Sequence, residues 1–154
     1  MKKPEKYMEQ APVLENSLLA PGVFRIVVKA PKIAADCLPG QFVMVRLTSF
    51  ADPLLRRPLS IAGADPETGM ITLICRIVGH GSEMLSTVKV NTLLDIMGPL
   101  GRGFALECER PLLVGGGIGL APLLFVAEYC CPKPVEVLAG GRTCDELFWA
   151  KLFS

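Results

Sequence analysis

The chain has 154 residues, of which 51% are hydrophobic, and its 16 basic and 15 acidic side chains leave a formal net charge of +1. A chain of this length can bury the core of one domain, or of two small ones. The near-neutral charge argues against the broad basic surface that nucleic acids and anionic membranes attract. Small molecules or another protein are therefore the expected partners, with no nucleic acid and no membrane.

The apolar stretches are short and interrupted by Gly and Pro. Examples are residues 112–114 and 119–127, well below the ~20 residues that a membrane-spanning helix needs. The charged start at residues 1–6 lacks the apolar core of a secretory signal. We therefore expect no transmembrane segment and a cytoplasmic location.

The cysteines are spread along the chain and form no Cys-x-x-Cys pair. They are Cys37, Cys75, Cys108, Cys130, Cys131 and Cys144. Zinc and iron–sulfur sites usually draw on such local pairs, so no metal ligand is assigned to any residue. Reduced and mostly buried thiols are expected in this compartment, with disulfides as the alternative.

The first hundred residues alternate short apolar runs with turn residues, which predicts an antiparallel β-domain. The expected strands, each preceded by a turn that contains Gly or Pro, are 23–28, 41–47 and 70–78. A single helix is expected in this half, over residues 83–88, with Ser82 as its N-cap. The domain should therefore be a barrel or a sandwich.

The pattern changes after residue 108. The expected order is strand, helix, strand, helix, over residues 111–114, 118–129, 135–139 and 145–152. Such alternation predicts a parallel α/β unit. We therefore expect a β-domain over residues 1–108 and an α/β unit over residues 109–154.

A glycine cluster joins the first strand and helix of this unit: Gly115, Gly116, Gly117, Ile118 and Gly119. At such a junction, backbone amides and the helix dipole can receive a pyrophosphate. The third glycine of the usual dinucleotide fingerprint is replaced by Leu120, so an ordinary Rossmann dehydrogenase fits poorly. A tight turn without a ligand is the alternative. Arg142, after the next strand, could contact the same nucleotide or be an ordinary exposed arginine.

The run Arg56-Arg57-Pro58-Leu59-Ser60 combines a guanidinium, which can bind phosphate, with a hydroxyl two residues beyond a proline that fixes φ. On an extended strand, Arg57 and Leu59 share one face, and Pro58 and Ser60 share the other. An extended, two-ended ligand such as a dinucleotide suits this arrangement better than a single phosphate does. A solvated arginine pair is the alternative.

The turn Gly79-His80-Gly81-Ser82 is a second candidate anion site, at the start of the expected helix. His80 is the only histidine and has no partner carboxylate or serine nearby in sequence, so we expect a loop residue. No nucleophile–base pair and no paired acids stand out. Redox chemistry carried by a cofactor is therefore expected in place of hydrolysis, and no catalytic residue is assigned.

Four motifs, in order and at matching separations, resemble the ferredoxin-NADP reductase superfamily, and within it the electron-transfer subunits of bacterial NAD-type dihydroorotate dehydrogenases. They are RPLS at 57–60, ICRIVGHGS at 74–82, GPLG at 98–101 and GGGIGLAP at 115–122. The resemblance implies an all-β antiparallel FAD-binding barrel over residues 1–108. An incomplete parallel α/β nucleotide-binding domain would follow over residues 109–154.

The resemblance also implies roles for individual residues. Arg57, in the motif with Pro58, would pair with the flavin pyrophosphate, and Leu59 and Ser60 would line the isoalloxazine ring. The remaining cofactor-binding residues that it implies are Ile74, Cys75 and Arg76 beside the flavin, Gly81 and Ser82 on phosphate, and Gly115 to Gly119 with Arg142 toward NAD(H).

The implied activity is transfer of hydride between NADH and FAD, followed by electron transfer to a catalytic dihydroorotate dehydrogenase subunit in pyrimidine biosynthesis. Family members have a longer nucleotide domain and a cysteine-rich lobe with a 2Fe-2S cluster, whose ligands are absent from these 154 residues. Two alternatives stay open. One is a related reductase subunit that serves ferredoxin and NADP, or sulfide, and the other is a non-catalytic docking module.

Overall fold

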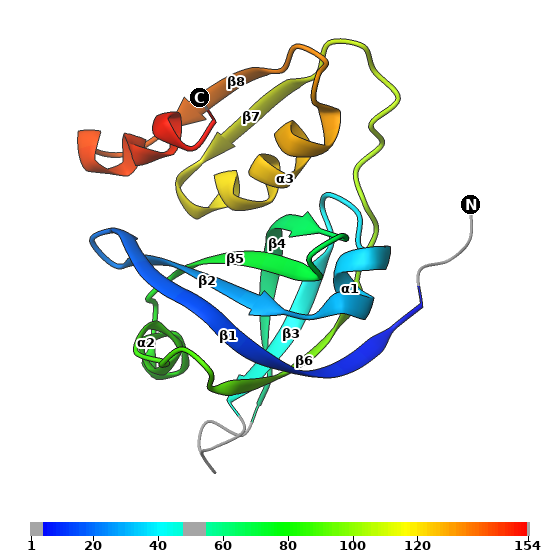
Figure 1. Ribbon diagram of the computed structural model, residues 1–154. Coiled ribbons are helices and arrows are strands. Elements are labelled where there is room, and N and C mark those ends of the chain that lie inside the picture. The colour runs from blue at the N-terminus through cyan, green and yellow to red at the C-terminus, as the bar shows by residue number, and fades with distance from the viewer. Residues whose placement is uncertain (1–4, 48–54, 154) are drawn as a thin grey trace.

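The computed structural model describes residues 5–47 and 55–153. Six antiparallel strands close into a barrel in the order β1-β2-β5-β4-β3-β6 (Figure 1). The strands are β1 (Tyr7–Ala20), β2 (Val23–Lys29), β3 (Phe42–Leu47), β4 (Arg57–Asp65), β5 (Met70–Arg76) and β6 (Leu93–Leu100). The expectation of an all-β antiparallel barrel is confirmed. The strand expected at 70–78 ends at Arg76, two residues early.

The barrel is filled by aliphatic side chains that alternate along its strands. Ile26, Val43, Ile71, Leu73 and Ile96 are fully buried, as expected for strands with one face toward a closed core. Closure pairs both edges of the sheet, which removes the exposed edges that open sheets must protect. The strands therefore hold their outward-facing residues in a defined register.

Two short helices accompany the barrel, and both differ from the sequence-based expectation. α1 (Pro31–Asp36) was not expected, because its six residues are too few to show a helical period; it forms where Ile33 and Ala34 enter the barrel core. α2 (His80–Ser86) begins earlier than the expected helix over 83–88, with Gly79 as its N-cap. Ser82 as the N-cap is therefore wrong, and His80 is the exposed first residue of the helix, not a loop residue.

The second part of the chain is a small α/β unit. Its elements are β7 (Leu112–Gly116), the 3-10 helix η1 (Gly117–Leu120), α3 (Ala121–Cys130), β8 (Glu136–Gly140) and the 3-10 helix η2 (Cys144–Lys151). β7 and β8 pair in parallel, which confirms the expected strand–helix–strand order. The single helix expected over 118–129 is split, since its first turn is 3-10, and the last helix is 3-10 throughout.

A shared hydrophobic core joins the two parts. α3 lies between the barrel and the β7–β8 sheet (Figure 1) and packs against β4. The cluster at this boundary takes Ala62 and Ile74 from the barrel, and Leu120, Leu124 and Trp149 from the α/β unit. Trp149 is only 1% exposed. This core sets the position of the carboxyl ends of β7 and β8 beside the end of β5.

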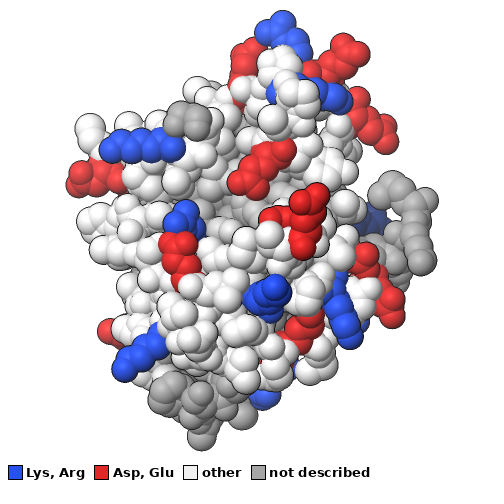
Figure 2. Space-filling view, viewed as in Figure 1, with Lys and Arg blue, Asp and Glu red and all other residues white. Residues whose placement is uncertain are grey.

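The charges on the surface are mixed in sign. On the face shown in Figure 2, basic and acidic side chains are interspersed and neither sign forms a continuous patch. Within the ranges that the structure describes, no helix has both the length and the apolar character needed to span a bilayer.

Candidate functional site

The RPLS motif forms the first four residues of β4, antiparallel to β3. Arg57 lies opposite Val45 and Leu59 opposite Val43, and both valines are fully buried. Because opposite residues of paired strands share a face, Leu59 points inward, where it packs against the barrel core. Leu59, although part of the motif, therefore also contributes to the packing of the barrel core.

Pro58 and Ser60 occupy the other face of β4. Pro58 is exposed, and Ser60 is half-buried opposite Phe42. Across residues 5–47 and 55–153, no hydrogen bond to the Ser60 hydroxyl is found. A hydroxyl on the outer face of a rigid strand is therefore available to a ligand.

Arg57 meets the start of α2 at Gly81, which brings two of the sequence motifs together. A Cβ on Gly81 would stand 2.0 Å from Nε and 2.3 Å from Cζ of Arg57. The guanidinium therefore fills the space that a side chain at position 81 would need. Arg57 Nη1 also donates a hydrogen bond to the Leu55 carbonyl oxygen.

Ser82 shapes the turn that precedes α2. Its Oγ accepts hydrogen bonds from the backbone N–H groups of Val78 (2.8 Å) and Gly79 (3.1 Å), and donates one to the Gly79 carbonyl oxygen (2.8 Å). The first N–H groups of any helix lack an acceptor within it. Gly81, the second residue of α2, lies beside the Arg57 guanidinium, so this corner of the barrel brings a cation to the start of a helix.

The three predicted residues at the end of β5 point in different directions. Ile74 is buried in the core shared with the α/β unit, and Cys75 is buried inside the barrel. Burial raises the pKa of the Cys75 thiol to about 12. Arg76 reaches the α/β unit, where its guanidinium lies close to Gly117 and bonds Glu146 on η2.

A cavity of about 450 Å³ opens at the carboxyl ends of β7 and β8. It is lined by Arg76, Gly116, Gly117, Ile118, Gly140, Gly141, Arg142 and Glu146. The structure thus brings Arg76, the glycine turn and Arg142 into one cavity, at the edge where open α/β sheets bind their ligands. Gly117 has a positive φ of 53°, which favours glycine in this turn.

Gly115 and Gly119 do not line that cavity. A Cβ on Gly115 would stand 2.9 Å from Leu120 Cδ2, so this glycine allows the turn to pack closely onto the strand. No heavy atom lies within 4 Å of a Cβ built on Gly119. The roles of the two glycines toward a nucleotide stay predictions.

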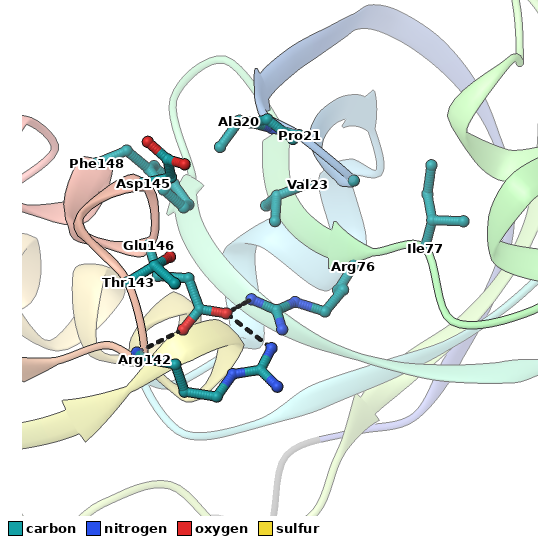
Figure 3. Close-up of a pocket in the computed structure, with 11 residues that line it drawn as sticks. Ala20, Pro21, Val23, Arg76, Ile77, Arg142, Thr143, Asp145, Glu146 and Phe148 are labelled. Carbon is teal, nitrogen blue, oxygen red and sulfur yellow. Dashed lines mark hydrogen bonds and ion pairs between the residues drawn. The ribbon is translucent and has the colours of Figure 1, made fainter.

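Glu146 is the residue of this cavity that the sequence motifs missed. It accepts hydrogen bonds from Arg76 Nη2 (3.0 Å), Arg142 Nη2 (3.0 Å) and the Arg142 backbone N–H (2.9 Å), as Figure 3 shows. These donors, led by the Arg142 N–H, lower the pKa of Glu146 to about 2. The spacing of four residues from Arg142 was the one available sequence signal.

The neighbouring arginine, Arg56, has a structural partner. It bonds Asp95 of β6, which also binds Arg46 Nη2 at 2.8 Å. Asp95 is 3% exposed, and the hydrogen bond from Arg56 is the main cause that lowers its pKa. Arg56 and Arg57 are therefore not a solvated pair, since one binds β6 and the other packs against α2.

Comparison with known proteins places these features in a family. The oxidoreductase FAD-binding domain family matches residues 12–104. The electron transfer subunit of dihydroorotate dehydrogenase B (NAD(+)) from Geobacillus sp. (strain WCH70) is 38% identical over 152 residues, which cover 95% of this chain and 59% of the relative. The subunit of the same name from Desulforamulus reducens is 43% identical over 120 residues, covering 77% of this chain and 46% of the relative.

Solved structures agree with this assignment. An NADH-dependent reduced ferredoxin-NADP oxidoreductase, studied for flavin-based electron bifurcation, superposes with a TM-score of 0.77 at 32% identity, covering 90% of this chain and 51% of that one. The ferredoxin reductase of carbazole 1,9a-dioxygenase reaches a TM-score of 0.80 at 24% identity over 96% of this chain and 46% of that one, which shows a common fold. The chain spans about 59% of the length of the Geobacillus relative. By family match, barrel topology and motif order, the chain belongs to the oxidoreductase FAD-binding domain family and is ferredoxin reductase-like.

Proposed function

We propose that this chain binds FAD on its barrel and carries electrons between NAD(H) and a partner, as the electron-transfer subunit of an NAD-type dihydroorotate dehydrogenase. Relatives at 38% and 43% identity are named electron transfer subunits of dihydroorotate dehydrogenase B (NAD(+)). These names support the proposal that this chain is such a subunit and that it works with a catalytic partner. Oxidation of dihydroorotate would take place on the partner catalytic subunit. The heteromeric complex and its role in pyrimidine biosynthesis are part of the same proposal.

The contact between Arg57 and Gly81 is the observation that carries the flavin site. The Arg57 guanidinium lies against the second residue of α2 at one corner of the barrel, and a guanidinium is a donor suited to a pyrophosphate. The glycine leaves the space that the arginine fills. The residues present therefore fit the phosphate end of a dinucleotide.

The remaining predicted residues would orient the ring. Ser60 offers a hydroxyl on the outer face of β4, and Arg76 stands at the end of the neighbouring strand β5. Ile74 of β5 is buried, so it would support this wall from behind. These side chains are held by paired strands, so they would position a ligand without first having to become ordered. When bound, the flavin would supply both one-electron and two-electron transfer.

The cavity at the carboxyl ends of β7 and β8 would receive NAD(H). Arg76 and Arg142 provide positive charge there, and the glycine turn permits close approach of a phosphate to the backbone. A 2Fe-2S cluster does not fit this chain in the same way. Over residues 5–47 and 55–153, no three His, Cys, Asp or Glu side chains gather to hold a metal.

A related reductase subunit that serves ferredoxin and NADP is the second candidate. It is favoured by the structural likeness, at 32% identity, to an NADH-dependent reduced ferredoxin-NADP oxidoreductase. Both candidates share the flavin site and differ in the electron partner. Reduction of a purified dihydroorotate dehydrogenase catalytic subunit, compared with reduction of ferredoxin, distinguishes them.

The proposal is tested by adding FAD to the purified chain, removing unbound cofactor and recording the visible spectrum. We expect a flavin band at roughly 450 nm that remains with the protein and is bleached by NADH under anaerobic conditions. A chain that stays colourless after incubation with FAD would overturn the proposal and favour the docking module. If the protein retains flavin but NADH does not bleach it, FAD binding by the barrel would be kept and electron transfer from NADH would be rejected.

A further inference from the structure

The donors around Glu146 form a set that is suited to phosphate. Two guanidinium groups and one backbone N–H converge on this single carboxylate, at 3.0, 3.0 and 2.9 Å. Arginine and backbone N–H groups are the standard protein ligands of phosphate groups. The structure thus contains a phosphate-type donor set that an internal carboxylate occupies.

The three residues come from separate elements and meet only in the folded chain. Arg76 ends β5 of the barrel, Arg142 follows β8, and Glu146 lies on η2. Gly141 makes the approach possible, since a Cβ there would stand 3.0 Å from the Glu146 Cβ. The absence of a side chain at position 141 therefore lets the carboxylate reach both arginines.

These residues form a wall shared by two cavities. One is the cavity of about 450 Å³ beside the glycine turn, and the other, of about 300 Å³, lies against the β1–β2 turn. Figure 3 shows the Glu146 carboxylate facing both guanidinium groups, at the lining of the second cavity. The Arg142 side chain is 82% exposed, whereas that of Glu146 is 17% exposed. A ligand in the first cavity would therefore reach the same N–H groups that Glu146 binds.

We infer that Glu146 is a built-in competitor for the anion site that Arg76, the Arg142 side chain and the Arg142 backbone N–H would offer to a phosphate group. Entry of the ligand would require the Glu146 carboxylate to turn away from the arginines. The inference rests on the proposed function for the site and its natural ligand, the pyrophosphate of NAD(H), and adds Glu146 as the group that competes for that site.

Competition with Glu146 would also make the site selective. A singly charged ligand such as acetate would bind the two arginines little better than the Glu146 carboxylate that already occupies them. A pyrophosphate carries more charge and more acceptor oxygens, so it can engage both arginines at once. The site should therefore reject acetate and accept pyrophosphate.

The experiment is calorimetric titration of the full chain with inorganic pyrophosphate at low ionic strength, with FAD present in excess so that the pyrophosphate corner at Arg57 and Gly81 is already filled. We expect Glu146→Gln to bind pyrophosphate roughly tenfold more tightly than the wild type, the gain expected when one competing charged contact is removed. Glu146→Ala should change affinity in the same direction. Arg142→Met should bind more weakly than the wild type.

Asp145→Asn is the matched control, because this adjacent carboxylate has no ion pair with the residues that the structure describes. Its affinity for pyrophosphate should stay near that of the wild type. Unchanged or weaker binding by Glu146→Gln, with a native circular dichroism spectrum, would overturn the inference.

FAD titration of the same proteins separates this inference from the proposed function. The flavin site at Arg57 and Gly81 does not include Glu146, so retained flavin together with unchanged pyrophosphate affinity in Glu146→Gln would reject the competitor alone. A wild type that binds no FAD while Glu146→Gln gains affinity for pyrophosphate would reject the flavin proposal and leave the anion site standing.

Discussion

The guanidinium of Arg57 occupies the volume in which a side chain at position 81 would stand, 2.0 Å from the ideal Cβ of Gly81 to Nε of Arg57. A strand motif and a turn motif, separate in sequence, are thereby parts of one surface. The glycine is needed because the arginine is there, and the arginine also donates a hydrogen bond to the Leu55 carbonyl oxygen. A change at either residue should therefore alter the same site.

Gly81→Ala should displace the Arg57 guanidinium and weaken FAD binding. The expected loss is about 1.5–3 kcal/mol of binding free energy if one hydrogen bond to a charged group is broken. Gly79→Ala is the matched control, because a Cβ at Gly79 meets no atom within 4 Å and its φ of 175° is ordinary extended backbone. Fluorescence quenching of FAD on titration measures both. Equal affinities of the two variants would show that the Arg57 position does not matter to the flavin.

Arg57→Ala should weaken FAD binding by a similar amount, on the order of 1.5–3 kcal/mol, because it removes the cation itself. Arg110→Ala removes an arginine of an exposed ion pair with Glu136 and serves as the control for charge. The two variants are compared by flavin titration at several salt concentrations. If Arg110→Ala lowered affinity as much, only the net charge of the chain would be involved.

Asp95→Asn should destabilise the barrel. Asp95 is buried and pairs with Arg46 and Arg56, whose side chains are 38% and 22% exposed. Partial solvation of both arginines reduces the loss below that of a fully buried pair, so the free energy of unfolding should fall by about 1–3 kcal/mol. Urea unfolding measures this change. Glu15→Gln, in the more exposed pair with Arg25, should cost less than about 1 kcal/mol.

The stabilising effect of Asp95 should depend on pH in a defined direction. Its pKa in the folded chain is lowered, mainly by the hydrogen bond from Arg56. A group of this kind contributes fully above its unfolded pKa of about 3.9, and the contribution is lost as the pH falls through the lower folded value. The difference in unfolding free energy between wild type and Asp95→Asn should be constant from about pH 5 to 8 and shrink below about pH 4. A difference that grows in acid would contradict this account.

The cysteines should divide into two classes by reactivity. Cys108, Cys131 and Cys144 are exposed, whereas Cys37, Cys75 and Cys130 are buried. Burial raises the pKa of Cys37 and of Cys75 to about 12, so neither forms a thiolate near neutral pH. A thiol reagent at pH 8 should modify three cysteines rapidly in the native chain and six after denaturation. Rapid native modification of Cys75 would show that the barrel opens.

The sequence by itself determined the local elements. Turn residues mark most of the barrel strands, and the order of strand, glycine turn and helix after residue 108 predicts the parallel unit that β7 and β8 form. The RPLS motif was correctly placed on an extended strand with alternating faces. These features depend on residues close together in the chain, whose periodicity and backbone preferences can be read directly.

The tertiary structure decided what distant residues do together. α1 forms because Ile33 and Ala34 find a place in the barrel core, which no local pattern reveals. The closed strand order, the contact between Arg57 and Gly81, and the meeting of Arg76 with Glu146 all join segments that are far apart in sequence. Such contacts arise from packing between elements, and packing overrides local propensity. The RPLS motif was therefore visible in the sequence, whereas the contact of Glu146 with Arg76 appeared only in the fold.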